Sequence, residues 1–158
     1  MMFLGVNSLY YIVYSSILFI FILMFPALIF PTFLNFLGFI LALLLSIYLS
    51  YTIYFIMICF AFWFGEVRSL VVSYNVAMLV LSGQYIPIRL FPENILQVLN
   101  WTPIRYLVDF PVSIATGLLP KSEWLLGFLV ASIWCFILSI ISLFIYRNGI
   151  KSYEAYGS

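Results

Sequence analysis

The sequence has no histidine, two cysteines and few charges, since acidic and basic residues make up only 7% of its 158 residues. Without histidine, the chain cannot supply paired-histidine haem ligation, a histidine-containing zinc site or a histidine general base. Cys59 and Cys135 lie far apart inside apolar runs, which is typical of small buried side chains and not of a disulfide or a metal pair. These absences exclude the common forms of metal and acid–base catalysis.

Sequence motifs for catalysis and nucleotide binding are also missing. There is no GxxxxGK[ST] phosphate loop, no HExxH, and no histidine to activate a serine or cysteine nucleophile. The six basic and five acidic residues leave a net charge of +1, which gives no reason to expect nucleic acid as a partner. We predict a protein that is not an enzyme and has no catalytic, cofactor-binding or metal site of its own.

Apolar residues are abundant instead, at 66% of the chain, and no charge occurs before Glu66. A helix of those 65 residues would be about 98 Å long, whereas the hydrocarbon core of a bilayer is about 30 Å thick. The stretch must therefore fold back, and Pro26 and Pro31 mark the place. This pattern predicts an all-α, polytopic integral membrane protein.

We expect a single membrane domain over residues 1–158. Its four expected transmembrane spans cover about 9–28, 35–63, 69–88 and 124–146. Charge, proline and tryptophan return between the third and fourth spans, where two short amphipathic helices are expected at about 92–100 and 103–117. Each is too short to cross a bilayer, so the pair either lies at the interface or dips in as a re-entrant pair packed on protein.

The distribution of basic residues bears on orientation. Arg68, Arg147 and Lys151 are expected on one side of the membrane, and Arg89, Arg105 and Lys121 on the other. This three-to-three division decides nothing by number. Because Arg147 and Lys151 directly follow the last span, and Arg105 has Asp109 as a possible partner four residues on, we favour a cytoplasmic C-terminus.

Two ladders of small residues recur at every fourth position, which keeps each ladder on one narrow helix face. They are Gly38, Ala42, Ser46 and Ser50 in the second span and Gly127, Ala131, Cys135 and Ser139 in the fourth. Membrane helices are generally rich in such residues, so the ladders either reflect composition or mark faces for close helix packing. We hypothesise that they pack the bundle.

Residues 79–117 read LVLSGQYIPIRLFPENILQVLNWTPIRYLVDFPVSIATG. A span ends in a Ser-Gly-x-x-x-Pro turn, and a Phe-Pro helix, a Pro-x-Arg-Tyr segment and a Phe-Pro-Val segment follow it. The tail RNGIKSYEAYGS is a basic segment followed by a tyrosine and a terminal glycine. In this order and spacing, the chain resembles the late part of ABC-2-type permeases, and is most similar to small permeases of multidrug-type exporters.

The resemblance implies six spans around a translocation path at a dimer interface, with a re-entrant helical pair between the last two spans. It also implies that separate cytoplasmic ATPase subunits bind the ATP, so no cofactor is expected on this chain. The family's two earlier spans and its coupling helix have no counterpart here, so the chain is expected to correspond to spans three to six. Its expected partners are an ABC ATPase, a second permease chain or the missing N-terminal permease half, and the lipid bilayer of a bacterial plasma (inner) membrane.

Candidate residues follow from this region. The polar side chains that could form a path or gate are Asn75, Gln84, Arg105, Tyr106 and Asp109. A local helix pair is the more common role of an Arg and an Asp spaced like Arg105 and Asp109, and Tyr106 either lines a path or anchors at the headgroups. The family-matching residues expected to set turns and helix ends, ahead of any substrate contact, are Gly83, Pro87, Pro92, Pro103, Pro111 and Gly117.

The sequence thus predicts the membrane-spanning permease subunit of an ATP-driven exporter of unknown substrate. The alternative is a four-span scaffold or assembly subunit that transports nothing and stabilises a partner complex through its small-residue faces.

Overall fold

The computed structural model of the chain is all-helical over the residues it describes, which are 31–156 together with Ser16, Ile20 and Met24. Its helices in chain order are α3 (Phe33–Cys59), α4 (Ala61–Phe64), α5 (Arg68–Leu81), α6 (Glu93–Trp101), α7 (Asp109–Ala115) and α8 (Lys121–Tyr156), with the short 3-10 turns η1 (Ile88–Leu90) and η2 (Arg105–Leu107). The first expected span, 9–28, lies outside the described residues apart from those three helical positions.

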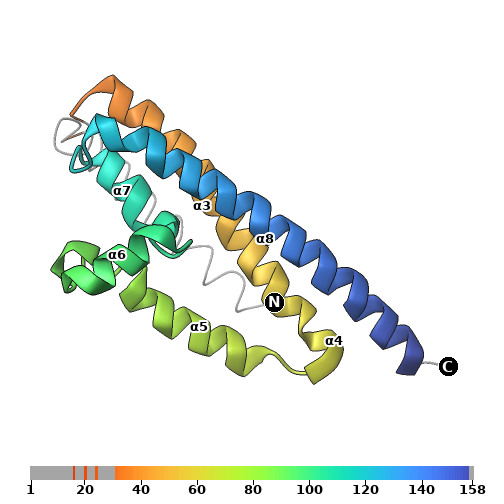
Figure 1. Cartoon of the computed structure of the whole chain (residues 1–158). Coiled ribbons are helices and arrows are strands. Elements are labelled where there is room, and N and C mark those ends of the chain that lie inside the picture. The colour runs from red at the N-terminus through yellow and green to blue at the C-terminus, as the bar shows by residue number, and fades with distance from the viewer. Residues whose placement is uncertain (1–15, 17–19, 21–23, 25–30, 157–158) are drawn as a thin grey trace.

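The two longest helices, α3 and α8, run antiparallel and side by side (Figure 1). Two described helical stretches, Phe33–Phe64 and Lys121–Lys151, are long and apolar enough to cross a membrane. Their ends define the two ends of the bundle. At one end Gly117 approaches Pro31, and at the other the Phe62 ring lies against Gly149.

The N-terminus of α3, at the end of the bundle where Gly117 approaches Pro31, has a side-chain cap. The Thr32 hydroxyl accepts a hydrogen bond from the backbone N–H of Asn35, which satisfies one of the free donors at the helix start. The Asn35 side chain then donates to the carbonyl of Ile114 at 2.7 Å. The cap therefore also ties the beginning of α3 to the end of α7.

The helix within the third expected span ends at Leu81, seven residues before the expected limit at Ile88. Gly83 has a φ of +87°, a conformation that favours glycine directly after a helix end. Pro87 has no N–H with which to continue a helix. At 14 residues, α5 is about 21 Å long, so the chain beyond it to η1 is irregular and not helical.

The helix expected over 103–117 is interrupted at Val108, whose backbone angles are not helical. Pro111, one of the residues expected to set turns and helix ends, lies in the first turn of α7. Its ring would clash with the Leu107 carbonyl if the helix extended back through it. The freed Leu107 carbonyl accepts a hydrogen bond from the Ser46 hydroxyl of α3 instead. Pro111 thus prevents one helical hydrogen bond, and the Ser46 hydroxyl supplies another donor in its place.

The core lies where α7 packs between α3 and α8. Phe110 of α7 stacks edge-on against Tyr106 and Phe128, with ring centroids 5.2 and 5.3 Å apart. The fully buried side chains around it include Leu49, Ile114 and Ala131. η2 meets α3 at Ser46, about 20 Å along the helix from Phe33, so the α6–α7 segment reaches the middle level of the bundle.

Candidate functional site

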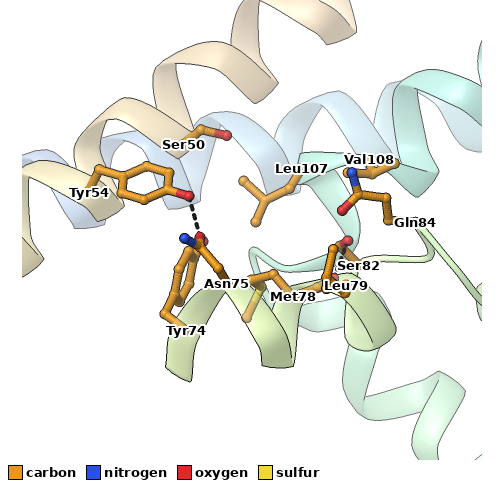
Figure 2. Close-up of a pocket in the computed structure, with 10 residues that line it drawn as sticks. All are labelled: Ser50, Tyr54, Tyr74, Asn75, Met78, Leu79, Ser82, Gln84, Leu107 and Val108. Atoms are coloured by element: carbon orange, nitrogen blue, oxygen red, sulfur yellow. Dashed lines mark hydrogen bonds between the residues drawn. The ribbon is translucent and has the colours of Figure 1, made fainter. Parts of the chain in front are cut away.

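A cavity of about 300 Å³ with several polar side chains in its wall lies between α3, α5 and η2 (Figure 2). We call it the α3–α5 cavity. Its lining residues are Ser50, Tyr54, Tyr74, Asn75, Met78, Leu79, Ser82, Gln84, Leu107 and Val108. Hydroxyl and amide groups alternate there with apolar walls, and no charged side chain is among them. Such a lining can hydrogen-bond an uncharged group while excluding bare ions.

One hydrogen bond and one ring contact connect α3 to α5 across this cavity. The Tyr54 hydroxyl donates to the side-chain oxygen of Asn75, and the Tyr54 and Tyr74 rings meet edge-on at 5.6 Å (Figure 2). The Ser82 hydroxyl donates to the carbonyl of Met78 at the end of α5. The cavity wall is therefore assembled from residues about 20 positions apart in sequence.

The sequence candidates divide between this cavity and the α6–α7 segment. Asn75 and Gln84 line the α3–α5 cavity. Arg105 instead pairs with Asp109 at 3.2 Å and donates to the Asn100 side chain, whereas the Tyr106 hydroxyl donates to the Asn100 carbonyl at 2.9 Å. Arg105 and Tyr106 therefore meet at Asn100, and Asp109 joins them through its pair with Arg105. None of the three lines the cavity that holds Asn75 and Gln84.

The Arg105–Asp109 pair is partly shielded, with side-chain exposures of 20% and 13%. The pair bridges the break at Val108, because Arg105 begins η2 and Asp109 begins α7. Asn100 adds the end of α6 to the same network. These bonds hold the three short helical pieces in one arrangement where backbone hydrogen bonds alone do not.

The ladder in α3 faces inward for three of its four members, with Gly38, Ala42 and Ser46 buried and Ser50 in the cavity wall. A Cβ on Gly38 would lie 2.6 Å from the Trp124 ring of α8 and 3.0 Å from Ile114 of α7. This ladder therefore allows both neighbouring helices to approach α3 closely.

The ladder in α8 is buried at Gly127, Ala131 and Cys135. A Cβ on Gly127 would overlap the Phe110 ring, so this ladder receives the aromatic side chain of α7. Ser139 is partly exposed, and its hydroxyl shares a hydrogen bond of 2.7 Å with the Tyr48 hydroxyl of α3. Each ladder therefore contacts large side chains of α7 or of the opposite long helix. The glycines of the two ladders do not pack directly on each other.

The turn candidates lie at element boundaries. Gly83 and Gly117 have positive φ directly after α5 and α7, and Pro92 immediately precedes α6. Pro87 precedes η1. The second short helix was expected to begin at Pro103, but Thr102 ends α6 with an extended backbone, and Pro103 lies in the turn to η2. Pro87 also lines a second cavity, with Gly83 and Asp109.

Sequence reasoning missed Tyr54, Tyr74 and Ser82 in the α3–α5 cavity, and Asn100 in the α6–α7 network. Tyr54 and Tyr74 lie inside expected spans among many other aromatic residues, so the sequence offered no separate signal for them. Asn100 had one available signal, because a polar residue at the end of an amphipathic helix often caps its neighbours. Within the described ranges, no group of three or more Cys, Asp or Glu side chains is placed to hold a metal ion.

Comparison with known protein families gives one match. The family described as ABC-2 family transporter protein matches residues 2–157, which is nearly the whole chain. No curated protein and no solved structure matches the chain at a significant level.

Proposed function

This chain belongs to the ABC-2 family of transporter proteins, and from that premise we propose that it is a permease subunit that exports its substrate when a separate ABC ATPase hydrolyses ATP. ABC-2 membership makes it a membrane protein, and permeases of this kind leave ATP binding to their ATPase partner. The observation that carries the proposal is the polar α3–α5 cavity, which lies between apolar helices of a transporter-family chain.

We propose four crossings, made by the segment before Pro31, by α3, by the α5 region and by α8. α5 alone is about 21 Å long, shorter than the roughly 30 Å of hydrocarbon, so the irregular segment after it would complete the third crossing. Irregular backbone is tolerated at membrane depth where it lines a cavity or is covered by protein. Ser82 and Gln84 line the α3–α5 cavity, and Gly83 and Pro87 line the second one, which supports this assignment.

The proposed orientation places α4 and the C-terminal end of α8 in the cytoplasm. Phe62 packs on Gly149 at that end of the bundle, and Arg68, Arg147 and Lys151 belong to the segments that meet there (Figure 1). A cluster of basic residues near span ends is typical of the cytoplasmic face. The α6–α7 segment would then enter the membrane from the outer side.

The substrate path in this proposal runs along the α3–α5 cavity, with Asn75 and Gln84 as polar contacts. Tyr54 and Tyr74 add aromatic faces beside them, which suits an amphiphilic substrate with an uncharged polar part. A second permease chain, or a further permease segment, would complete the wall that α5 leaves open. The Arg105–Asp109 pair would act at the outer end of the path as a brace or gate.

Co-purification from the native host tests the proposal. The full tagged chain is expressed in its own cells, and an ABC ATPase is expected in the eluate, together with another permease segment. In the same cells, Asn75→Leu should reduce export of amphiphilic compounds, whereas Val72→Leu on the exposed face of α5 should leave it unchanged. Reproducible recovery of a different membrane complex without an ATPase would replace the exporter with the scaffold.

A further inference from the structure

The second cavity, of about 310 Å³, lies between η1 and α7 and combines one cation with apolar walls. We call it the Arg89 cavity. Its lining residues are Gly83, Pro87, Arg89, Val108, Asp109, Val112, Ser113 and Leu118. It shares only Val108 with the α3–α5 cavity, so it is a separate site. Its volume corresponds to about ten water molecules, enough for more than a small ion.

Arg89 is the cation without a carboxylate partner in this cavity. Its guanidinium donates to the hydroxyl of buried Ser113 at 3.4 Å, and in the described part of the chain no carboxylate lies within ion-pair distance of it. A guanidinium offers five N–H donors in a planar fork that matches a phosphate group. Arg89 is exposed, and beyond this one long hydrogen bond no protein acceptor among the described residues is shown for its other donors.

Asp109 also lines the Arg89 cavity, so its charge must be considered. Asp109 is already paired with Arg105 at 3.2 Å. The pair as a unit is close to neutral, which leaves Arg89 as the uncompensated charge. The cavity is therefore expected to attract an anion.

The location of the Arg89 cavity corresponds to the approach to one membrane surface. Ser113 and Leu118 belong to the turn that ends α7, and Gly117 within that turn packs against Pro31 at the end of the bundle. The apolar part of the cavity wall is supplied by Pro87, Val108, Val112 and Leu118. Free inorganic phosphate would gain nothing from these walls, whereas the glycerol and upper acyl region of a lipid would pack on them.

We propose that the Arg89 cavity binds the phosphate headgroup of an anionic membrane lipid, with Arg89 and Ser113 as its polar contacts. Such a lipid would sit beside α7 and hold the α6–α7 segment against the rest of the bundle. This site differs from the proposed substrate path in position and charge. It depends on the membrane location of the chain and is independent of what the chain transports.

The test is a lipid titration of the purified full chain in a neutral detergent, followed by thermal unfolding. Phosphatidylglycerol should raise the melting temperature more than phosphatidylcholine with the same acyl chains. Arg89→Gln should weaken the apparent phosphatidylglycerol affinity about tenfold or more, since a charge-assisted hydrogen bond is lost. Arg68→Gln removes an exposed arginine outside the cavity and should leave that affinity unchanged.

Further variants keep the result decisive if Arg89→Gln fails to fold. Arg89→Lys retains the charge without the planar fork, and Ser113→Ala removes the second contact, so each should weaken phosphatidylglycerol binding by a smaller factor than Arg89→Gln. Equal stabilisation of the unaltered chain by both lipids would overturn the proposal, as would unchanged affinity in these two variants. Stabilisation by inorganic phosphate equal to that by phosphatidylglycerol would show a free-anion site and reject the lipid.

Discussion

Besides α8, the helices α7 and α5 also pack beside α3, and they differ sharply in how the chain holds them. α7 has seven residues and buries five of them, whereas α5 has 14 residues and buries none. α7 is fixed by Phe110 against α8 and by one hydrogen bond from the Asn35 side chain to the Ile114 carbonyl in its last turn. α5 touches α3 chiefly through Tyr54, across a polar cavity.

The helices α3, α7 and α8 thus form a tightly packed frame, to which α5 is only loosely attached. In a membrane, helices are held together mainly by close van der Waals packing and interhelical hydrogen bonds, because lipid is as apolar as leucine. The α3–α7–α8 frame has both, and α5 has few of either within this chain. Substitutions should therefore reduce stability strongly in the frame and weakly on α5. Their effects on transport should follow the opposite order, with the larger effects on α5.

The largest loss of stability is expected from Gly127→Leu, which forces a side chain into the space of the Phe110 ring. Overpacking of a core typically costs about 1 to 3 kcal/mol and occasionally more, and the direct overlap here places the loss at about 3 kcal/mol. Thermal unfolding in detergent measures it. Ser132→Leu, on the exposed face of α8, is the matched control and should change stability by less than about 0.5 kcal/mol.

Phe110→Ala should be the next most damaging change. Removing a buried phenylalanine costs about 3 to 5 kcal/mol in the cores of soluble proteins. Part of that cost is the transfer free energy of the side chain from water into the core, and this part is small for helices that are surrounded by detergent. We expect about 2 to 3 kcal/mol in the same unfolding assay. Phe136→Ala, at a side chain that is 68% exposed, should have almost no effect. Equal losses for the two variants would contradict the packing of α7 as the centre of the frame.

Ser46→Ala tests the hydrogen bond that replaces the one lost at Pro111. It leaves the Leu107 carbonyl without the Ser46 donor, so a loss of about 1 kcal/mol is expected. Ser50→Ala, one turn further along α3 and in the cavity wall, should cost less. If Ser46→Ala is neutral, the break at Val108 does not depend on α3.

The smallest effect on stability is expected from Tyr54→Phe, which removes the hydroxyl that reaches Asn75. The hydrogen bond is exposed, so the loss should stay below about 0.5 kcal/mol. Transport should fall more than stability does, because the same hydroxyl faces the proposed path. A variant with normal transport but a large loss of stability would mean that α5 belongs to the frame.

Local rules predicted much of what lies between α5 and α8. Gly83 and Gly117 follow helix ends because glycine tolerates positive φ, and Arg105 reaches Asp109 because residues four apart share a helix face. The early end of α5 and the break at Val108 were not predicted. Both depend on competition between helix continuation and contacts with distant segments, such as Ser46 with Leu107.

By itself, the sequence determined that this chain is helical and resides in a membrane, since long charge-free stretches leave no other way to satisfy the backbone. Its motif order also determined the ABC-2 family. Only the tertiary structure decided that Asn75 meets Tyr54, that Arg89 meets Ser113, and that Phe110 fills the space over Gly127. Such pairings depend on how whole helices rotate and slide against one another, and no spacing within a single helix encodes that register.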